Sequence, residues 1–354
     1  MAASTPPSLP LIYLRAALGF VTKKHSLSPE MTRIPSALIP EETLQFTIDP
    51  KHVKFFQSIV HSTPSTTTDT LTRGQKDDKD NTETRIVPIT YVQCILNSMP
   101  MNLLTHRQFP LNIVGSVHES TKLETRKALY LHHDNNTKPL SLMARCKLLP
   151  EIARSDKNDW IFSTVTDIDY ASPSSSSSST DDLTDTTKSI MTITNEFRIL
   201  NPQRNKMAKS QPPPPADDED YLDDTIWEPM AQWEFPVDTG RRYAVLNGDI
   251  NPIHLFPLTA KIFGYKSCIA HGMYSVCKLT EEHPRLVDTS STSSSSGSAA
   301  MTTTVTARFT RPILLPNKTI RVFLKRGTDD YVIGTRNEKD GQLKAAVKGK
   351  ISLD

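Results

Sequence analysis

The sequence predicts an α+β protein of two tandem domains, in which helices pack against mostly antiparallel sheets. Three observations support this prediction. Several segments of the second half alternate apolar and polar residues with the period of a strand. Apolar residues recur at helical spacing over residues 91–104, and a second helix is predicted over residues 272–282. With 354 residues, the chain is too long for one small domain.

The predicted elements of the second half are mostly strands. These are Ala231–Val237, Thr302–Arg311, Thr319–Lys325, Tyr331–Arg336 and Leu343–Ser352. Residues 337–341 are predicted to form a turn, because polar residues there end in Gly341. In the first half, we interpret the apolar stripe of residues 91–104 as a core-facing helix, with Pro100 as its kink or end.

The composition excludes several classes of protein. Lys and Arg (41) nearly balance Asp and Glu (39), so no strong field attracts the chain to nucleic acid or to an acidic membrane. The four cysteines form no CxxC pair, which indicates reduced thiols of an intracellular protein and not a zinc site or a disulfide framework. No run of residues reaches the length of about 20 apolar residues that a membrane span needs.

Residues 1–30 form an apolar and basic N-terminal extension. Two interpretations stay open: a mitochondrial presequence, or a first helix docked on the following domain. The predicted location is therefore intracellular, either cytoplasmic or mitochondrial.

Low-complexity segments divide the rest of the chain. Three Ser/Thr-rich stretches, which begin at Ser62, Pro173 and Ser291, are predicted to be flexible surface insertions. A proline run followed by acids predicts a stiff linker at residues 209–224, between domains at 31–208 and 225–354.

The two halves also resemble each other weakly. The strand-like segments that begin at Thr192 and Thr304 each carry Phe at the same offset, which favours an ancestral duplication over chance similarity.

An acid and an imidazole flank a helix start in the second half. Asp249 and His254 stand on either side of Asn251-Pro252, directly after Gly248. Asn is a good N-cap and Pro suits the first helical position, so a short helix is expected from here to about Phe263. A carboxylate and a neutral imidazole that share one water can accept one proton and donate another.

A second glycine begins the helix predicted over residues 272–282. At Gly272 a thioester carbonyl could approach the backbone N–H, and the positive end of the helix dipole would stabilise a developing enolate. Taken singly, each residue has a plain structural alternative: a cap for Asp249, a structural imidazole for His254, and packing for Gly272. Their joint spacing favours function.

The segment Tyr243–His254 with Ala260, together with Ala270-His271-Gly272-Met273, resembles the hydratase-2 motif of the MaoC-like dehydratases and R-specific enoyl-CoA hydratases. Residues 308–316 resemble the strand that follows the central helix in that family. The resemblance implies a tandem (double) hotdog fold, in which each repeat is a long central helix wrapped by a curved antiparallel sheet. The family commonly has Ser, Thr, Gly or Cys where this chain has Asn247, which puts the fine positioning of the site in doubt.

The resemblance also implies an activity. The chain would reversibly hydrate a trans-2-enoyl thioester to the (3R)-3-hydroxyacyl thioester. Asp249 and His254 would act through one water, Gly272 would form the oxyanion hole, and Asn251 and Gly248 would support the active-site turn. No metal or other cofactor is required, because the thioester itself acidifies C2. The substrate would be carried by CoA or by acyl carrier protein, which is a potential partner.

The first half carries no Gly-Asp-x-Asn-Pro-x-His sequence, so a degenerate repeat with one active site per chain is expected. Such a chain could be a monomer with an internal pseudo-dimer, or a homodimer. Two other functions remain open: a non-catalytic module that binds acyl-CoA or an acyl carrier, and a thioesterase. An assay of hydration beside thiol release separates the three.

Overall fold

The computed structural model describes residues 32–34, 40–62, 65–67, 85–111, 113, 116–131, 140–155, 159–171, 189–199, 223, 225–286, 302–336 and 342–354. The predicted N-terminal extension lies outside these residues. So do the turn at 337–341, nearly all of the linker and most of the Ser/Thr-rich stretches. Among the described residues, no helix has both the length and the apolar character that crossing a bilayer requires.

The chain forms two compact units that interleave along the sequence. Unit 1 takes its described residues from 1–47, 96–124 and 141–216, and unit 2 takes them from 48–95, 125–140 and 217–354. The predicted domains, 31–208 and 225–354, are each continuous, whereas residues 48–95 cluster with the C-terminal part of the chain. The units follow spatial contacts and the predicted domains follow sequence resemblance, so the boundaries of the two repeats stay a prediction.

Unit 1 is a β-sheet with a short helix. Its strands lie in the order β1-β6-β7-β8-β4. Their bounds are β1 (Glu41–Ile48), β4 (Ser116–Thr125), β6 (Leu140–Arg154), β7 (Trp160–Tyr170) and β8 (Met191–Ile199). The helix α4 (Ser98–Thr105) contributes Leu104 to a core of large apolar side chains that includes Phe109, Phe162 and Phe197.

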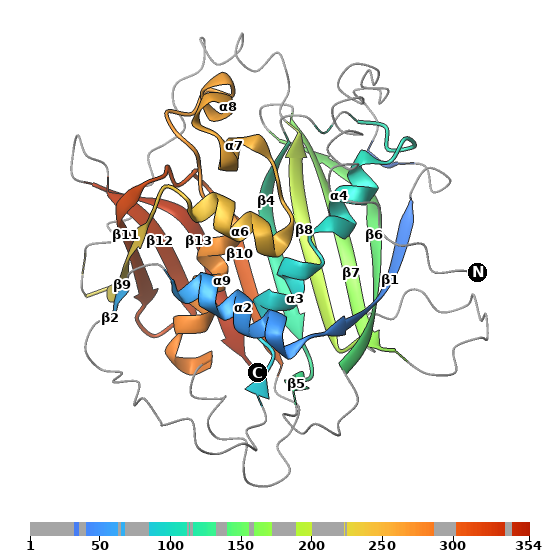
Figure 1. Ribbon diagram of the computed structural model, residues 1–354, viewed down its shortest axis with the longest axis horizontal. Helices are drawn as coiled ribbons and strands as arrows, with labels where there is room; N and C mark the ends of the chain where they lie inside the picture. The colour runs from blue at the N-terminus through green and yellow to red at the C-terminus, as the bar shows by residue number, and fades with distance from the viewer. Residues whose placement is uncertain are drawn as a thin grey trace, which may run out of the picture. The chain divides into compact units, whose positions relative to one another are not determined.

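Unit 2 contains a longer sheet and most of the helices (Figure 1). Its strands lie in the order β10-β13-β12-β11-β9-β2. Their bounds are β2 (Ser65–Thr67), β9 (Trp227–Phe235), β10 (Thr303–Phe309), β11 (Asn317–Lys325), β12 (Asp330–Arg336) and β13 (Leu343–Leu353). A small ladder pairs β3 (Arg85–Ile86) with β5 (Tyr130–Leu131). All five strands predicted for the second half are thus confirmed within a few residues, because their alternation is a local signal.

The helix α9 (Gly272–Glu282) has the predicted bounds, and it packs on this sheet. Tyr274 contacts Phe235 of β9 edge to face, with ring centroids 5.0 Å apart. Phe309 at the end of β10 lies against Gly272, so closely that a Cβ on the glycine would stand 2.5 Å from the ring. A helix against an antiparallel sheet is the α+β arrangement that the sequence predicts.

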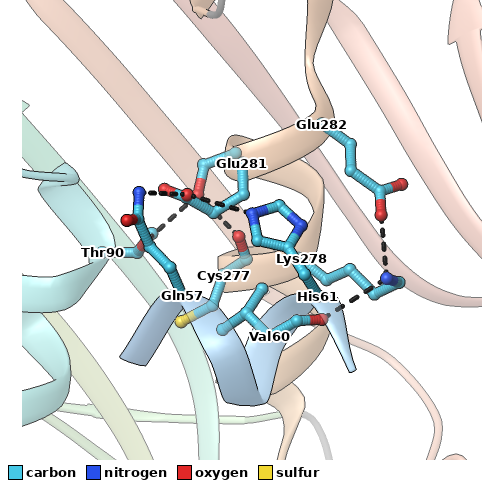
Figure 2. A network of polar contacts seen from close by, with 9 residues as sticks. Gln57, Val60, His61, Thr90, Cys277, Lys278, Glu281 and Glu282 are labelled. Carbon is cyan, nitrogen blue, oxygen red and sulfur yellow. Dashed lines mark hydrogen bonds and ion pairs between the residues drawn. The ribbon is translucent and has the colours of Figure 1, made fainter. Parts of the chain in front are cut away.

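Two helices from early in the chain cover α9 within unit 2. These are α2 (Pro50–His61) and α3 (Ile89–Ile95). Figure 2 shows the polar contacts that join them to α9. Gln57 of α2 donates to Glu281 over 3.0 Å, and the buried hydroxyls of Thr90 and Thr280 lie 3.0 Å apart. These contacts assign α2 and α3 to unit 2.

One predicted helix is wrong in its extent. The apolar stripe over residues 91–104 is divided between α3, which ends at Ile95, and α4, whose N-cap position is Asn97. Pro100 lies in the first turn of α4, where its missing N–H breaks no helical hydrogen bond. Helical periodicity continues across the break, and for this reason the sequence concealed it.

The Ser/Thr-rich stretch that begins at Ser62 was expected to be an insertion without regular structure. Its residues 65–67 instead form strand β2, which pairs antiparallel with residues 231–233 of β9. Backbone pairing with a neighbouring strand needs no apolar pattern in the sequence, so composition alone did not reveal it.

Candidate active site

Three short elements of unit 2 lead up to the start of α9 and form the surroundings of the candidate site. They are α6 (Thr239–Asn247), α7 (Pro252–Leu255) and α8 (Pro257–Ile262), which are visible together in Figure 1. One helix from the N-cap to about Phe263 was expected, but Phe256 adopts an extended conformation and separates α7 from α8. The residue before a proline is disfavoured in the helical region, so Pro257 explains the break.

Gly248 ends α6 and turns the chain toward the candidate acid. Its φ of 67° is left-handed, and its N–H donates to the carbonyl of Ala244 over 2.9 Å. A side chain at this position would strain the turn.

Three successive side chains then hold the backbone of the turn. The N–H of Asp249 donates to Asn247 Oδ1 (2.9 Å), and the N–H of Asn251 donates to Asp249 Oδ1 (3.0 Å). Next, the N–H of Ile253 donates to Asn251 Oδ1 (3.4 Å), so Asn251 is the N-cap that the sequence predicts. Each side chain serves the backbone two residues ahead, which is the geometry of an Asx turn. Asn247, the departure from the family pattern, thus has a defined local role.

His254 is held by a segment that is distant in sequence. Its Nδ1 lies 2.9 Å from the carbonyl oxygen of Ile269, and the N–H of Ile269 donates to the carbonyl of Ile253. A carbonyl only accepts, so Nδ1 carries the proton and Nε2 is left as an acceptor. Burial lowers the pKa of His254 below its usual value, with partial opposition from Asp249 and the Ile269 carbonyl. The ring is therefore neutral at physiological pH.

His271, the residue before α9, completes a cluster with Asp249 and His254. Its ring stacks on that of His254 with centroids 3.7 Å apart. Its Nε2 lies 3.3 Å from the backbone oxygen of Asp249 and 3.6 Å from the carboxylate. Both neighbours are acceptors, so Nε2 carries the proton. Burial, and then the neighbouring His254, lower the pKa of His271 to about 3.

One side-chain nitrogen or oxygen from each of Asp249, His254 and His271 lies within 4.8 Å of the other two. One water about 2.8 Å from each of two such atoms can bridge them. By distance alone the three residues could also hold a metal ion. However, the two rings are stacked with centroids 3.7 Å apart and an interplanar angle of 24°, so the lone pairs of their nitrogens lie in separate, nearly parallel planes and an ion bound to both would sit out of both planes. The geometry favours a shared water.

Gly272 is the first residue of α9, next to His271. The N–H groups at a helix start have no carbonyl one turn earlier to bond, so this N–H has no partner within the helix. The close approach of the Phe309 ring gives the glycine a packing role as well. The packing role is therefore supported at this residue, and the oxyanion role stays a prediction.

Sequence reasoning missed Gly240 on α6. A Cβ at this position would stand 2.3 Å from the backbone oxygen of His254, so only glycine lets α6 approach α7 this closely. Sequence reasoning also assigned no role to His271. No spacing rule marks either role, because both depend on contacts between segments that are separate along the chain.

The fold and this cluster define a class of protein domain. In it a helix packs on a β-sheet, and an acid and an imidazole converge at the start of a helix. Residues 222–348 match the profile of the family described as MaoC like domain. The predicted resemblance to MaoC-like dehydratases is thus confirmed for this part of the chain.

The similarity to known proteins extends along nearly the whole chain. The sequence is 24% identical, over 98% of this chain and 99% of the relative, to 3-hydroxyacyl-thioester dehydratase X of Mycobacterium tuberculosis. A crystal structure of HtdX from the same organism matches 87% of this chain and 98% of its own, with 21% identity and a TM-score of 0.55. A MaoC-like dehydratase from Phytophthora capsici matches 89% and 96%, with 16% identity and a TM-score of 0.55. These two structures show a shared fold.

Proposed function

We propose that the protein is a hydro-lyase that reversibly hydrates a trans-2-enoyl thioester to the (3R)-3-hydroxyacyl thioester. The MaoC-like domain and the full-length similarity to a 3-hydroxyacyl-thioester dehydratase support this class of enzyme and an acyl thioester as its substrate. The observation that carries the residue assignment is the convergence of Asp249 and His254 within 4.8 Å.

In this proposal one water binds between the two side chains. The Nδ1–H of His254 is engaged by the Ile269 carbonyl, so Nε2 accepts a hydrogen bond from the water and orients it. Asp249 accepts a proton as the water oxygen adds to C3 of the enoyl group. An equivalent proton is delivered to C2 through the same pair, so both residues end in their starting states. Acid–base assistance of this kind contributes roughly 10²–10⁴-fold in rate.

The developing enolate needs a separate donor. Gly272 is proposed to supply its backbone N–H to the thioester oxygen, with help from the positive end of the α9 dipole. Asn251 and Gly248 support the turn that carries the acid. No metal or redox cofactor takes part in the proposed reaction, since the thioester acidifies C2 and the enzyme supplies only proton transfers and the oxyanion hole.

We further infer that residues 31–208 and 225–354 form a tandem pair of hotdog repeats, the first degenerate and the second catalytic. The single Gly-Asp-x-Asn-Pro-x-His sequence supports one active site per chain. An internal pair of sheets can take the place of a homodimer partner, so both a monomer and a homodimer fit the proposal, and so do a cytoplasmic and a mitochondrial location.

The substitution Asp249→Asn tests the assignment. Asn keeps an Oδ1 that can accept from the N–H of Asn251, so the turn should survive while the proton acceptor is lost. We expect hydration of crotonyl-CoA to fall by roughly 10²–10⁴-fold with an unchanged circular dichroism spectrum. The matched control is Asp238→Asn at the start of α6, where the side chain makes no capping hydrogen bond.

Unchanged turnover in Asp249→Asn would remove the residue assignment. If the unaltered protein binds acyl-CoA tightly but hydrates none of a series of enoyl-CoAs of graded length, the enzyme proposal itself fails. The non-catalytic binding module would then replace it.

A further inference from the structure

The helix α8 presents large apolar side chains to solvent next to the candidate active site. Leu258 and Ile262, one helical turn apart on the same face, are 73% and 75% exposed. Phe256 and Phe263 at the two ends of the helix are more than half exposed. We call these four residues, together with Lys261, the α8 surface.

The α8 surface belongs to an ordered element. The hydroxyl of Thr259 donates to the carbonyls of Pro252 (2.7 Å) and Phe256 (2.8 Å), which ties α8 to α7. At the other end, the N–H of Gly264 donates to the carbonyl of Lys261 over 2.9 Å, and Gly264 turns the chain with a φ of 87°. A fixed helix that keeps adjacent apolar side chains in water is typical of an interaction site.

The chain segment that carries this surface is rich in cations. Lys261, Lys266 and Arg241 are exposed, and Arg242 is partly exposed. Across residues 239–280 the only acidic residue is Asp249. A second copy of the chain docked face to face would bring these cations against their own copies, which is unfavourable. Charge complementarity therefore points to an acidic partner.

We propose that the α8 surface docks an acidic carrier protein that bears the acyl group as a thioester. The inference rests on the proposed function and specifies the carrier of its substrate. The helix α8 follows α7 after one residue, and α7 carries His254, so a carrier bound here delivers its thioester beside the catalytic pair (Figure 1). Free CoA would satisfy the cations but leave Leu258 and Ile262 in water. An acidic protein partner would pair with the cations and also bury these two apolar side chains.

The test compares two carriers of the same acyl group. The 3-hydroxydecanoyl thioester is supplied either on CoA or on an acidic acyl carrier protein. The variants are the pair Lys261→Glu with Lys266→Glu, and the pair Leu258→Ser with Ile262→Ser. For both pairs we expect kcat/KM on the carrier protein to fall at least tenfold through KM, with kcat/KM on CoA within twofold of the unaltered enzyme. Added salt should weaken the carrier reaction of the unaltered enzyme and spare the CoA reaction.

Matched controls lie elsewhere in unit 2: Lys318→Glu on β11 for charge reversal and Ile226→Ser before β9 for loss of an exposed apolar group. Both control variants should keep the kcat/KM values that the unaltered enzyme has on each carrier. Equal losses on the two carriers, no loss on either, or a fall of several degrees in Tm would each overturn the proposal. So would binding of the unaltered enzyme to anionic vesicles in preference to the carrier protein. Failure of the proposed function would be visible separately, as absent turnover on both carriers.

Discussion

At the scale of single residues, the site is organised by side chains that bond their own backbone. Asn247, Asp249 and Asn251 each accept a hydrogen bond from the residue two positions ahead. A turn held three times in succession has little freedom, so the carboxylate of Asp249 is pre-positioned. This order was largely predictable, since Asn and Asp favour such turns wherever they occur.

His271 is the residue whose role the structure changes most. Its Nε2–H faces both the backbone oxygen and the carboxylate of Asp249, and its ring stacks on His254. Its Nδ1 is buried and has no hydrogen-bond partner among the described residues. An imidazole that satisfies only one of its two nitrogens is a poor choice for stability alone. This favours a role in positioning the acid.

The substitution His271→Phe separates positioning from packing. Phenylalanine keeps an aromatic ring to stack on His254 and removes both the Nε2–H donor and the unpartnered nitrogen. We expect kcat to fall about tenfold, the equivalent of one lost hydrogen bond of about 1.4 kcal/mol, with KM nearly unchanged and Tm maintained. Steady-state kinetics and thermal unfolding check this. An unaltered kcat would leave His271 with a packing role only.

At the scale of elements, α6 and α7 meet at a contact that admits no side chain. The Gly240→Ala variant would place a Cβ 2.3 Å from the backbone oxygen of His254, so α7 must move. We expect kcat/KM for enoyl-CoA hydration to fall roughly 10²-fold, since a shift of about 1 Å in a catalytic group has this effect. Gly264→Ala is an instructive contrast, because a Cβ there meets nothing within 4 Å and only the left-handed turn is strained. Equal activity of the two variants would contradict the expectation.

Lys278 forms an ion pair within α9 and also joins α9 to α2 (Figure 2). Lys278 has no exposed side-chain surface and lies 2.8 Å from Glu282, while its Nζ also donates to the carbonyl of Val60 over 3.4 Å. Glu282 in turn accepts from the indole N–H of Trp233 on β9 over 2.8 Å. A cation at the C-terminal end of α2 is also favourable for the dipole of that helix. This network fixes three elements of unit 2 together.

Removing the charge of Lys278 alone should lower the free energy of unfolding more than removing the charges of both Lys278 and Glu282. Lys278→Met leaves the partly buried Glu282 without its ammonium, and we expect the free energy of unfolding to fall by about 3 kcal/mol. Adding Glu282→Gln should restore part of it, since Gln still accepts from Trp233 and carries no charge. Urea denaturation of both variants measures the difference. A double variant less stable than Lys278→Met would contradict this account.

At the scale of the whole molecule, buried neutral histidines couple folding to pH. Burial lowers the pKa of His271 to about 3 and that of His283 to about 4, against about 6.5 in an unfolded chain. Between these values the unfolded state binds more protons than the folded state, so stability falls as the pH falls from about 6.5 toward 4.

Each such histidine contributes at most about 1.4 kcal/mol per pH unit to the dependence of the free energy of unfolding on pH. Urea denaturation at pH 7, 6 and 5 should show this loss, and His271→Phe should reduce the slope by about one group's share. Stability that is flat across this range, or a slope that the substitution leaves unaltered, would show that these imidazoles are protonated in the folded protein.

The sequence by itself determined the strands of the second half, the bounds of α9, the cap at Asn251 and the spacing of Asp249 and His254. All of these follow from signals that extend over a few residues, such as periodicity, capping and turn chemistry.

Only the tertiary structure decided that residues 48–95 pack in unit 2, that Gly240 makes room for His254, and that Ile269 and Asp249 fix the protons of two neutral imidazoles. Each depends on which distant segments meet in space. Hydrogen-bond partners and burial then set the tautomer and the pKa, and neither is encoded in local spacing.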